Sequence, residues 1–85
     1  MQREEIEAII RAILTARSNV DAKLDSLSTT ESLYEAGMTS HATVKVMLSL
    51  EDAFDVEFPD ELLERSVFDR IESIADAIEK LQSGR

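Results

Sequence analysis

Ser40 and His41 are neighbours in the chain, and they are the residue types that form a nucleophile and its base. Adjacent positions on a helix point about 100° apart, however, so His41 is poorly placed to accept the Ser40 proton. The chain has one histidine and no cysteine, and it lacks a glycine-rich phosphate loop and the spacing of metal ligands. We therefore expect no catalytic residues, no metal and no enzyme activity, with His41 facing solvent or a partner.

Ser40 also ends the stretch Gly37-Met38-Thr39-Ser40, which is typical of a turn that leads into a helix cap. Such short runs recur by accident, so a purely structural role is the first interpretation. The second is a modification site, because free backbone N–H groups and the helix dipole stabilise the negative charge of a phosphodiester at a helix start. On these residues alone, both interpretations stay open.

The helix after this turn should begin at Thr39 or Ser40, since either hydroxyl is a suitable cap, and run to about Phe54. A rotation of about 100° per residue places one apolar set on a core face: Val46, Met47, Leu50 and Phe54. Val44 and Leu48 instead fall in line with Ser40, each one helical turn beyond the last. We expect this ridge to point away from the core.

Three further helices should position this one. The first spans Glu4–Arg17 and repeats apolar residues at helical spacing, namely Ile6, Ile9, Ile10, Ile13 and Leu14. Pro59 ends the helix before it and can open a short third helix over Glu61–Arg65, with Leu62 and Leu63 inward. The fourth runs from a cap at Asp69 to Ser83. Residues 18–39 are predicted to form a long loop held by apolar anchors, which are Val20, Leu24, Leu27, Leu33 and Tyr34.

Length and charge limit the function classes. A chain of 85 residues is enough for one domain, over residues 1–85. It has no apolar run near the roughly 20 residues that cross a bilayer, so we predict that it binds no membrane. It also has no secretory signal and no cysteine, which fits a cytoplasmic location. We expect a monomer. The formal charge of −9 would repel a phosphate backbone, which makes nucleic acid an unsuitable partner.

Seven acidic residues and no basic one lie between Glu51 and Glu64. The ligand pattern and the central glycine of a calcium-binding helix–loop–helix are absent. A solvated acidic face and a docking surface for a basic partner both fit this segment.

The segment Ser32–Leu63 combines the turn, the serine, the second helix and the proline that follows it. Its sequence, "SLYEAGMTSHATVKVMLSLEDAFDVEFPDELL", resembles the acyl carrier protein family. The resemblance implies an all-α, acyl-carrier-protein-like four-helix bundle with a long first loop and a short third helix. It also implies that a phosphopantetheinyl transferase attaches 4′-phosphopantetheine from coenzyme A to Ser40. The thiol of that arm would hold an acyl or aminoacyl group as a thioester, so the protein would be a carrier rather than a catalyst.

The resemblance extends to recognition by partner enzymes. It implies partner-binding roles for positions beside the serine and along the second helix, which are Thr39, His41, Val44, Lys45, Leu48, Glu51 and Asp52. Family members usually carry Asp-Ser-Leu where this chain has Thr39-Ser40-His41, and Lys45 and Ala42 replace early acids. These differences disfavour docking with fatty acid synthesis enzymes.

Two motifs of this chain are similar to those of stand-alone aminoacyl carriers: "YEAG-x-x-S", which ends at Ser40, and "FD-x-EFPD-x-LL", which begins at Phe54. Those carriers are loaded by amino acid:carrier protein ligases that resemble seryl-tRNA synthetases, and they pass their cargo to a downstream acceptor enzyme. We therefore expect an aminoacyl carrier. The alternatives are a fatty acyl or polyketide carrier protein, and a non-enzymatic acidic module that binds a partner helix through Val44 and Leu48.

Overall fold

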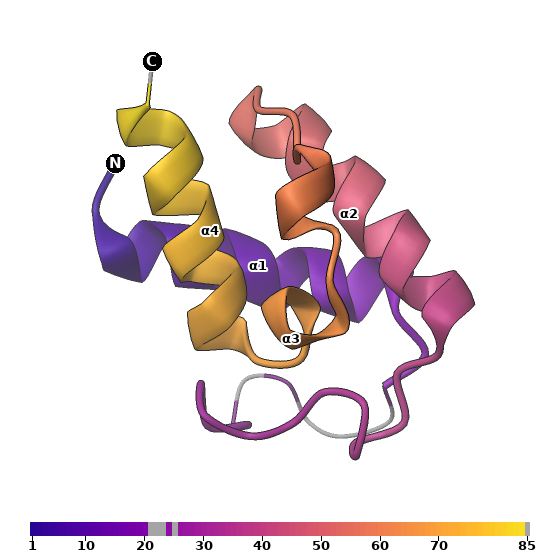
Figure 1. The fold of residues 1–85 in the computed structure, drawn as a ribbon. Coiled ribbons are helices and arrows are strands. Elements are labelled where there is room, and N and C mark those ends of the chain that lie inside the picture. The colour runs from indigo at the N-terminus through magenta and orange to yellow at the C-terminus, as the bar shows by residue number, and fades with distance from the viewer. Residues whose placement is uncertain (21–23, 25, 85) are drawn as a thin grey trace.

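The computed structural model describes residues 1–84 except 21–23 and 25. It consists of four α-helices and one 3₁₀ turn at Asp60–Leu62 (Figure 1); the helices are α1 (Arg3–Arg17), α2 (Ser40–Phe54), α3 (Arg65–Phe68) and α4 (Ile71–Ser83). The described residues contain no strand, which confirms the predicted all-α class with a long first loop and a short third helix. None of the helices found in this part of the chain has the length and apolar character needed to cross a membrane.

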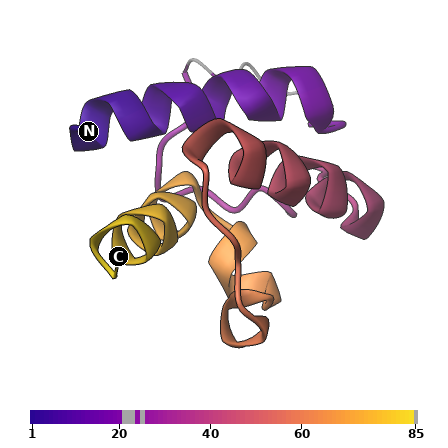
Figure 2. The same cartoon turned by 90° about the horizontal axis from the view of Figure 1, so that it is seen from above.

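α1 is the element on which the others are assembled, since it packs against both α2 and α4. Figure 2 shows α1 on one side of the molecule, with α2 and α4 next to it and α3 farther away. The predicted core faces are confirmed, because the fully buried side chains recur at helical spacing on all three long helices: Ile6, Ile10, Leu14, Val46, Leu50, Ile71, Ile74 and Ile78.

The loop between α1 and α2 is anchored in the described residues, as predicted. Leu24, Leu27 and Leu33 are buried in the core. The Arg11 guanidinium, on α1, donates to the backbone oxygen of Leu27 at 2.8 Å and also to that of Leu24. A side chain from the first helix thus satisfies loop carbonyl groups that no regular element would pair.

The third helix is not where we predicted it. Residues 60–62 form the 3₁₀ turn that follows Pro59, and α3 begins only at Arg65. Leu62 is half-buried, whereas Leu63 is exposed rather than inward. The buried residue of α3 is Phe68, whose ring centroid lies 5.3 Å from that of Phe58. This aromatic contact places the helix later in the chain than the proline alone suggests.

The predicted cap of α4 is also wrong. The N-cap is Arg70, whose backbone N–H donates to Ser73 Oγ at 3.2 Å. Asp69 instead binds the long loop: its carboxylate accepts a bond of 2.5 Å from the Ser32 hydroxyl, and its carbonyl accepts one of 2.5 Å from Leu33 N–H. Asp69 therefore joins the loop to the end of α3 instead of starting α4.

An ion cluster at Arg3 joins the start of α1 to α4. The guanidinium lies 2.8 Å from an Asp76 carboxylate oxygen, 2.5 Å from one of Glu79 and 3.1 Å from one of Glu7. The hydrogen bond to Asp76, with those to Glu7 and Glu79, raises the pKa of Arg3 above its ordinary value and outweighs the opposite effect of burial. Arg3 therefore stays charged, and the two helices stay linked at this end.

Candidate functional site

Ser40 is the first residue of α2, and its side chain is exposed. The helix is capped by the preceding residue, because Thr39 Oγ1 accepts a hydrogen bond of 3.1 Å from Ala42 N–H. This settles which of the two hydroxyl groups is the cap and confirms the predicted helix start. Among the described residues, no group hydrogen-bonds to the Ser40 hydroxyl. The serine is thus at the surface and is not needed to hold the helix.

Asn19 fixes the backbone that leads to Ser40. Its side-chain amide donates to the Gly37 carbonyl at 2.7 Å, and its oxygen accepts from Thr39 N–H at 3.1 Å. Gly37 has a φ of 111°, a left-handed conformation that favours glycine. Asn19 and Gly37 together therefore set the turn from which α2 departs. From the sequence, Asn19 was expected only to lie in the long loop over residues 18–39.

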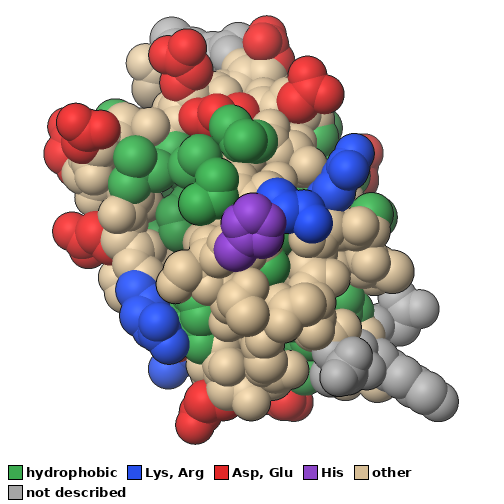
Figure 3. All heavy atoms as spheres, turned by 90° about the vertical axis from the view of Figure 1, so that its right-hand side faces the viewer, with side chains coloured by type: hydrophobic (Ala, Val, Ile, Leu, Met, Phe, Trp, Pro, Cys, Tyr) green, Lys and Arg blue, Asp and Glu red, His purple; other side chains and the backbone are tan. Residues whose placement is uncertain are grey.

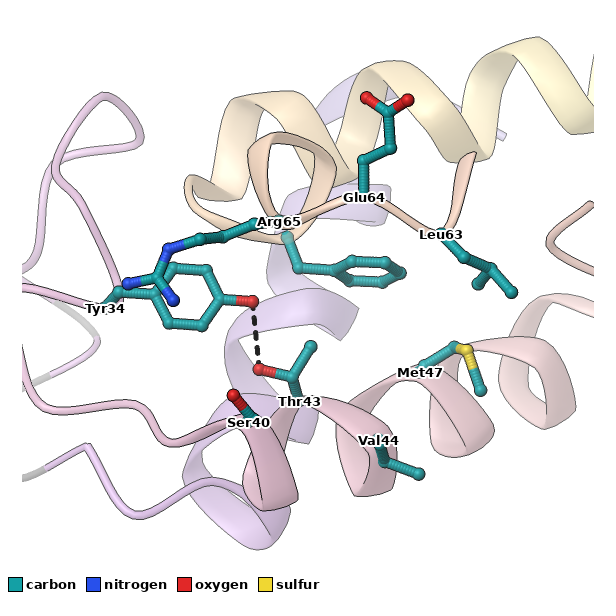
Figure 4. A pocket seen from close by; sticks show the side chains of 9 residues that line it. Tyr34, Ser40, Thr43, Val44, Met47, Leu63, Glu64 and Arg65 are labelled. Carbon is teal, nitrogen blue, oxygen red and sulfur yellow. Dashed lines mark hydrogen bonds between the residues drawn. The ribbon is translucent and has the colours of Figure 1, made fainter. Parts of the chain in front are cut away.

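Ser40 lies at the edge of a groove between α2 and the segment that leads into α3 (Figure 4). This Ser40 groove has a volume of about 370 Å³. Most of its lining is apolar, and the residues that line it are Tyr34, Ser40, Thr43, Val44, Met47, Leu63, Glu64, Arg65 and Phe68. The groove therefore offers a largely apolar surface beside an exposed alcohol.

Two polar contacts lie in the Ser40 groove. The Thr43 hydroxyl donates a hydrogen bond of 3.1 Å to the Tyr34 hydroxyl oxygen, which ties the long loop to the first turns of α2. The Arg65 guanidinium lies over the Tyr34 ring, with Cζ 3.9 Å from the ring centroid. Figure 4 shows these side chains and Ser40 at one end of the groove, with Met47 and Leu63 at the other.

The predicted outward ridge is confirmed. Val44 is 52% exposed and Leu48 is 56% exposed, and neither belongs to the core. Leu63, which is 46% exposed, adds a third large apolar side chain, and it shares the Ser40 groove with Val44. Figure 3 shows apolar surface with acidic side chains above it and to its left, and with a histidine and basic side chains to its right. This face of the molecule is suited to protein contact.

The remaining partner-binding residues expected from the resemblance are placed differently. Thr39, His41, Lys45 and Asp52 are all exposed on or beside α2. Glu51 is half-buried, and its carboxylate accepts a hydrogen bond of 2.9 Å from Phe58 N–H. Glu51 thus holds the segment after α2.

Sequence reasoning missed several residues around the serine. Thr43 and Arg65 were given no site role, and Phe68 was not identified at all. Tyr34 was predicted only as an anchor, although it contacts both Thr43 and Arg65. A helical projection places Thr43 one turn after Thr39, but no local pattern indicates the groove because its other wall comes from residues 63–68.

Comparison with known proteins gives three kinds of similarity. The family model described as "Phosphopantetheine attachment site" matches residues 5–79. The aminoacyl carrier protein of Agrobacterium fabrum (strain C58 / ATCC 33970) is 39% identical over 80 residues, which cover 94% of this chain and 96% of that protein.

Two solved structures are similar to this fold over most of the chain. One is from a complex of an engineered Bradyrhizobium japonicum glycine:[carrier protein] ligase with a carrier protein from Agrobacterium tumefaciens and ATP; the match has a TM-score of 0.84 and 40% identity, and covers 88% of this chain and 97% of that one. The other is a holo acyl carrier protein from Nitrosomonas europaea, with a TM-score of 0.80 and 28% identity, covering 98% of this chain and 99% of that one.

Proposed function

Because this chain belongs to the phosphopantetheine-attachment family of carrier proteins, we propose that Ser40 is the residue to which its phosphopantetheine is attached. The fold supports the premise, since the predicted acyl-carrier-protein-like four-helix bundle is confirmed by the likeness to a holo acyl carrier protein. The protein is a carrier and not an enzyme, as its one histidine and its lack of cysteine led us to expect.

The observation that carries the Ser40 assignment is the division of roles between two adjacent hydroxyl groups. Thr39 caps α2, and Ser40 is exposed with its oxygen not used by the fold. A transferase can therefore reach the serine without opening the helix. When attached, the arm supplies the thiol that this cysteine-free chain lacks.

We propose an aminoacyl group as the cargo. Support comes from the aminoacyl carrier protein that is 39% identical over nearly the whole chain. A similar carrier protein was solved with a glycine:[carrier protein] ligase, which makes glycine the first amino acid to test. Val44 and Leu48 are proposed to contact an amino acid:carrier protein ligase, with exposed His41, Lys45 and Asp52 around them.

Attachment is tested by incubating the protein with coenzyme A and a broad-specificity phosphopantetheinyl transferase. We expect intact-mass spectrometry to show the addition of one phosphopantetheinyl group, and peptide mapping to place it on Ser40. Ser40→Ala should gain no mass, whereas Thr39→Ala should still be loaded. A folded native protein that gains no mass would refute the assignment.

The cargo is tested on loaded protein with a glycine:carrier protein ligase, ATP and glycine. We expect a hydroxylamine-labile adduct on the arm that requires all three components. If fatty acid enzymes transferred malonyl or long acyl groups to the arm and no ligase aminoacylated it, the protein would be a fatty acyl or polyketide carrier. Full function of Ser40→Ala in cells would instead favour a non-enzymatic interaction module.

The other features expected from the sequence are part of the same proposal. We propose a single domain over residues 1–85 that works as a cytoplasmic monomer. Its partners would be the transferase, the ligase and a downstream acceptor enzyme. Size-exclusion chromatography with light scattering tests the monomer, and fractionation of the native cell tests the location.

A further inference from the structure

Arg65 is held at one end of the Ser40 groove by an aromatic ring. Its guanidinium lies 3.9 Å from the centroid of Tyr34, and the Tyr34 hydroxyl is in turn hydrogen-bonded to Thr43 on α2. A guanidinium stacked on a ring keeps its N–H donors directed outward in its own plane. The stack therefore orients Arg65 and leaves its donors available to an acceptor.

The charge of Arg65 is not neutralised by a neighbouring carboxylate in the part of the chain that the structure describes. There, the arginines within 4.0 Å of a carboxylate are Arg3 and Arg70, whose partners lie on α1 and α4. Glu64 also lines the groove, but its carboxylate points away from Ser40 in Figure 4. This is notable in a chain with 18 acidic and 9 basic residues.

We infer that Arg65 binds the phosphodiester formed on Ser40 and that Tyr34 is the platform that positions it. The inference rests on the proposed attachment at Ser40. A phosphodiester there places one negative charge at the edge of the groove that Arg65 lines. A planar guanidinium matches phosphate oxygens better than any other side chain, and charge-assisted bonds of this kind are stronger than neutral ones.

The contact also gives the arm a direction. His41 and Lys45 are the residues nearest to Ser40 in sequence that can carry a positive charge, but neither lines the Ser40 groove. A phosphate drawn to Arg65 turns the start of the arm into the Tyr34 end of the groove, and away from the His41 and Lys45 side of α2. Leu48, which is exposed and does not line the groove, then stays clear for a partner enzyme.

The test compares unloaded and loaded forms of the native protein, Arg65→Gln, Arg65→Lys and Arg70→Gln by NMR. Arg70→Gln is the matched control, because Arg70 is exposed near the same segment but does not line the groove. Loading should shift the Arg65 Nε–H resonance of the native protein more than that of any other arginine. Arg65→Gln should shift the ³¹P resonance of the loaded protein toward that of the same phosphodiester in urea-unfolded loaded protein, whereas Arg70→Gln should not.

Because Arg65 and the phosphate would form an exposed charge pair, Arg65→Gln should lower the ratio of groove-bound to free phosphate by about 1.5- to 5-fold. Arg65→Lys should give an intermediate value, and about 0.5 M salt should reproduce much of the loss in the native protein. Loaded native protein with an unmoved Arg65 resonance, or a ³¹P shift unchanged in Arg65→Gln, would overturn this inference alone. Failure of the native protein to accept the arm would overturn the Ser40 proposal and this inference with it.

Discussion

Thr39→Ala and Ser40→Ala form a pair of substitutions that should separate stability from loading. Both remove one hydroxyl from neighbouring exposed residues at the start of α2. Only the Thr39 hydroxyl accepts a backbone hydrogen bond of the helix, from Ala42 N–H at 3.1 Å. Thr39→Ala therefore leaves a helix N–H group without its side-chain partner, whereas Ser40→Ala removes no bond of the fold.

The size of the effect follows from the cap. Loss of a threonine N-cap costs about 0.5–2 kcal/mol of the free energy of unfolding. In a domain of this length each kcal/mol lowers the melting temperature by about 4–8 °C, so Thr39→Ala should melt several degrees below the native protein. Ser40→Ala puts a strong helix former at an exposed first position, and its free energy of unfolding should change by no more than about 0.5 kcal/mol.

The measurement is urea and thermal unfolding followed by circular dichroism, combined with the transferase assay on the same two proteins. Thr39→Ser keeps a hydroxyl at the cap and should restore most of the lost stability. We expect Thr39→Ala to be less stable but loaded, and Ser40→Ala to be stable but unloaded. If Ser40→Ala were destabilised as much as Thr39→Ala, the serine would be a cap and the division of roles between the two hydroxyl groups would be wrong.

Three other predictions concern the ridge, the loop and the core. Val44→Asp and Leu48→Asp should weaken ligase-dependent aminoacylation but change the melting temperature little, because both side chains are more than half exposed. Arg11→Met should lower the free energy of unfolding by about 1–3 kcal/mol, since two loop carbonyl groups lose their donor. Leu50→Ala should cost about 2–5 kcal/mol in urea unfolding, because this residue is fully buried on α2.

Each of these predictions has a control. Ala53→Asp adds the same charge to an exposed position of α2 off the ridge, and should leave aminoacylation unchanged. Unfolding of Val44→Asp would show that the ridge belongs to the core. For the loop, Arg17→Met removes an exposed α1 arginine, and an equal loss of stability in that variant would argue against the Arg11 contacts. A Leu50→Ala variant as stable as Leu50→Met would contradict the packing described for α2.

The long helices could be predicted because the sequence signals for each one lie within the helix or at its ends. Ile6, Ile10 and Leu14 repeat at helical spacing, and α1 forms where that repeat occurs. The second helix has both a hydroxyl cap and a periodic core face, so its start and its exposed ridge followed from the sequence. Ser40 could be proposed as the attachment residue because it lies where a turn signal meets the ridge.

The misplaced features depend on partners that are distant in the chain. Pro59 signals a helix start locally, but α3 forms later because Phe68 packs in the core against Phe58. Asp69 looks like a cap until its bond to Ser32, 37 residues earlier, is known. Arg65 gives no sign of a site role, because its platform Tyr34 lies in a separate loop. Local periodicity cannot report such pairs.

The Arg3 cluster has a practical consequence for handling the molecule. It links the first turn of α1 to Asp76 and Glu79 in the middle of α4, so the two extremities of the fold lie on the same side of the molecule. Figure 1 shows both at the opposite end of the molecule from the start of α2. A surface tether, a fluorophore or a fusion partner joined at either extremity would therefore leave the serine open to visiting enzymes, and a short bridge between the extremities would permit circular permutation.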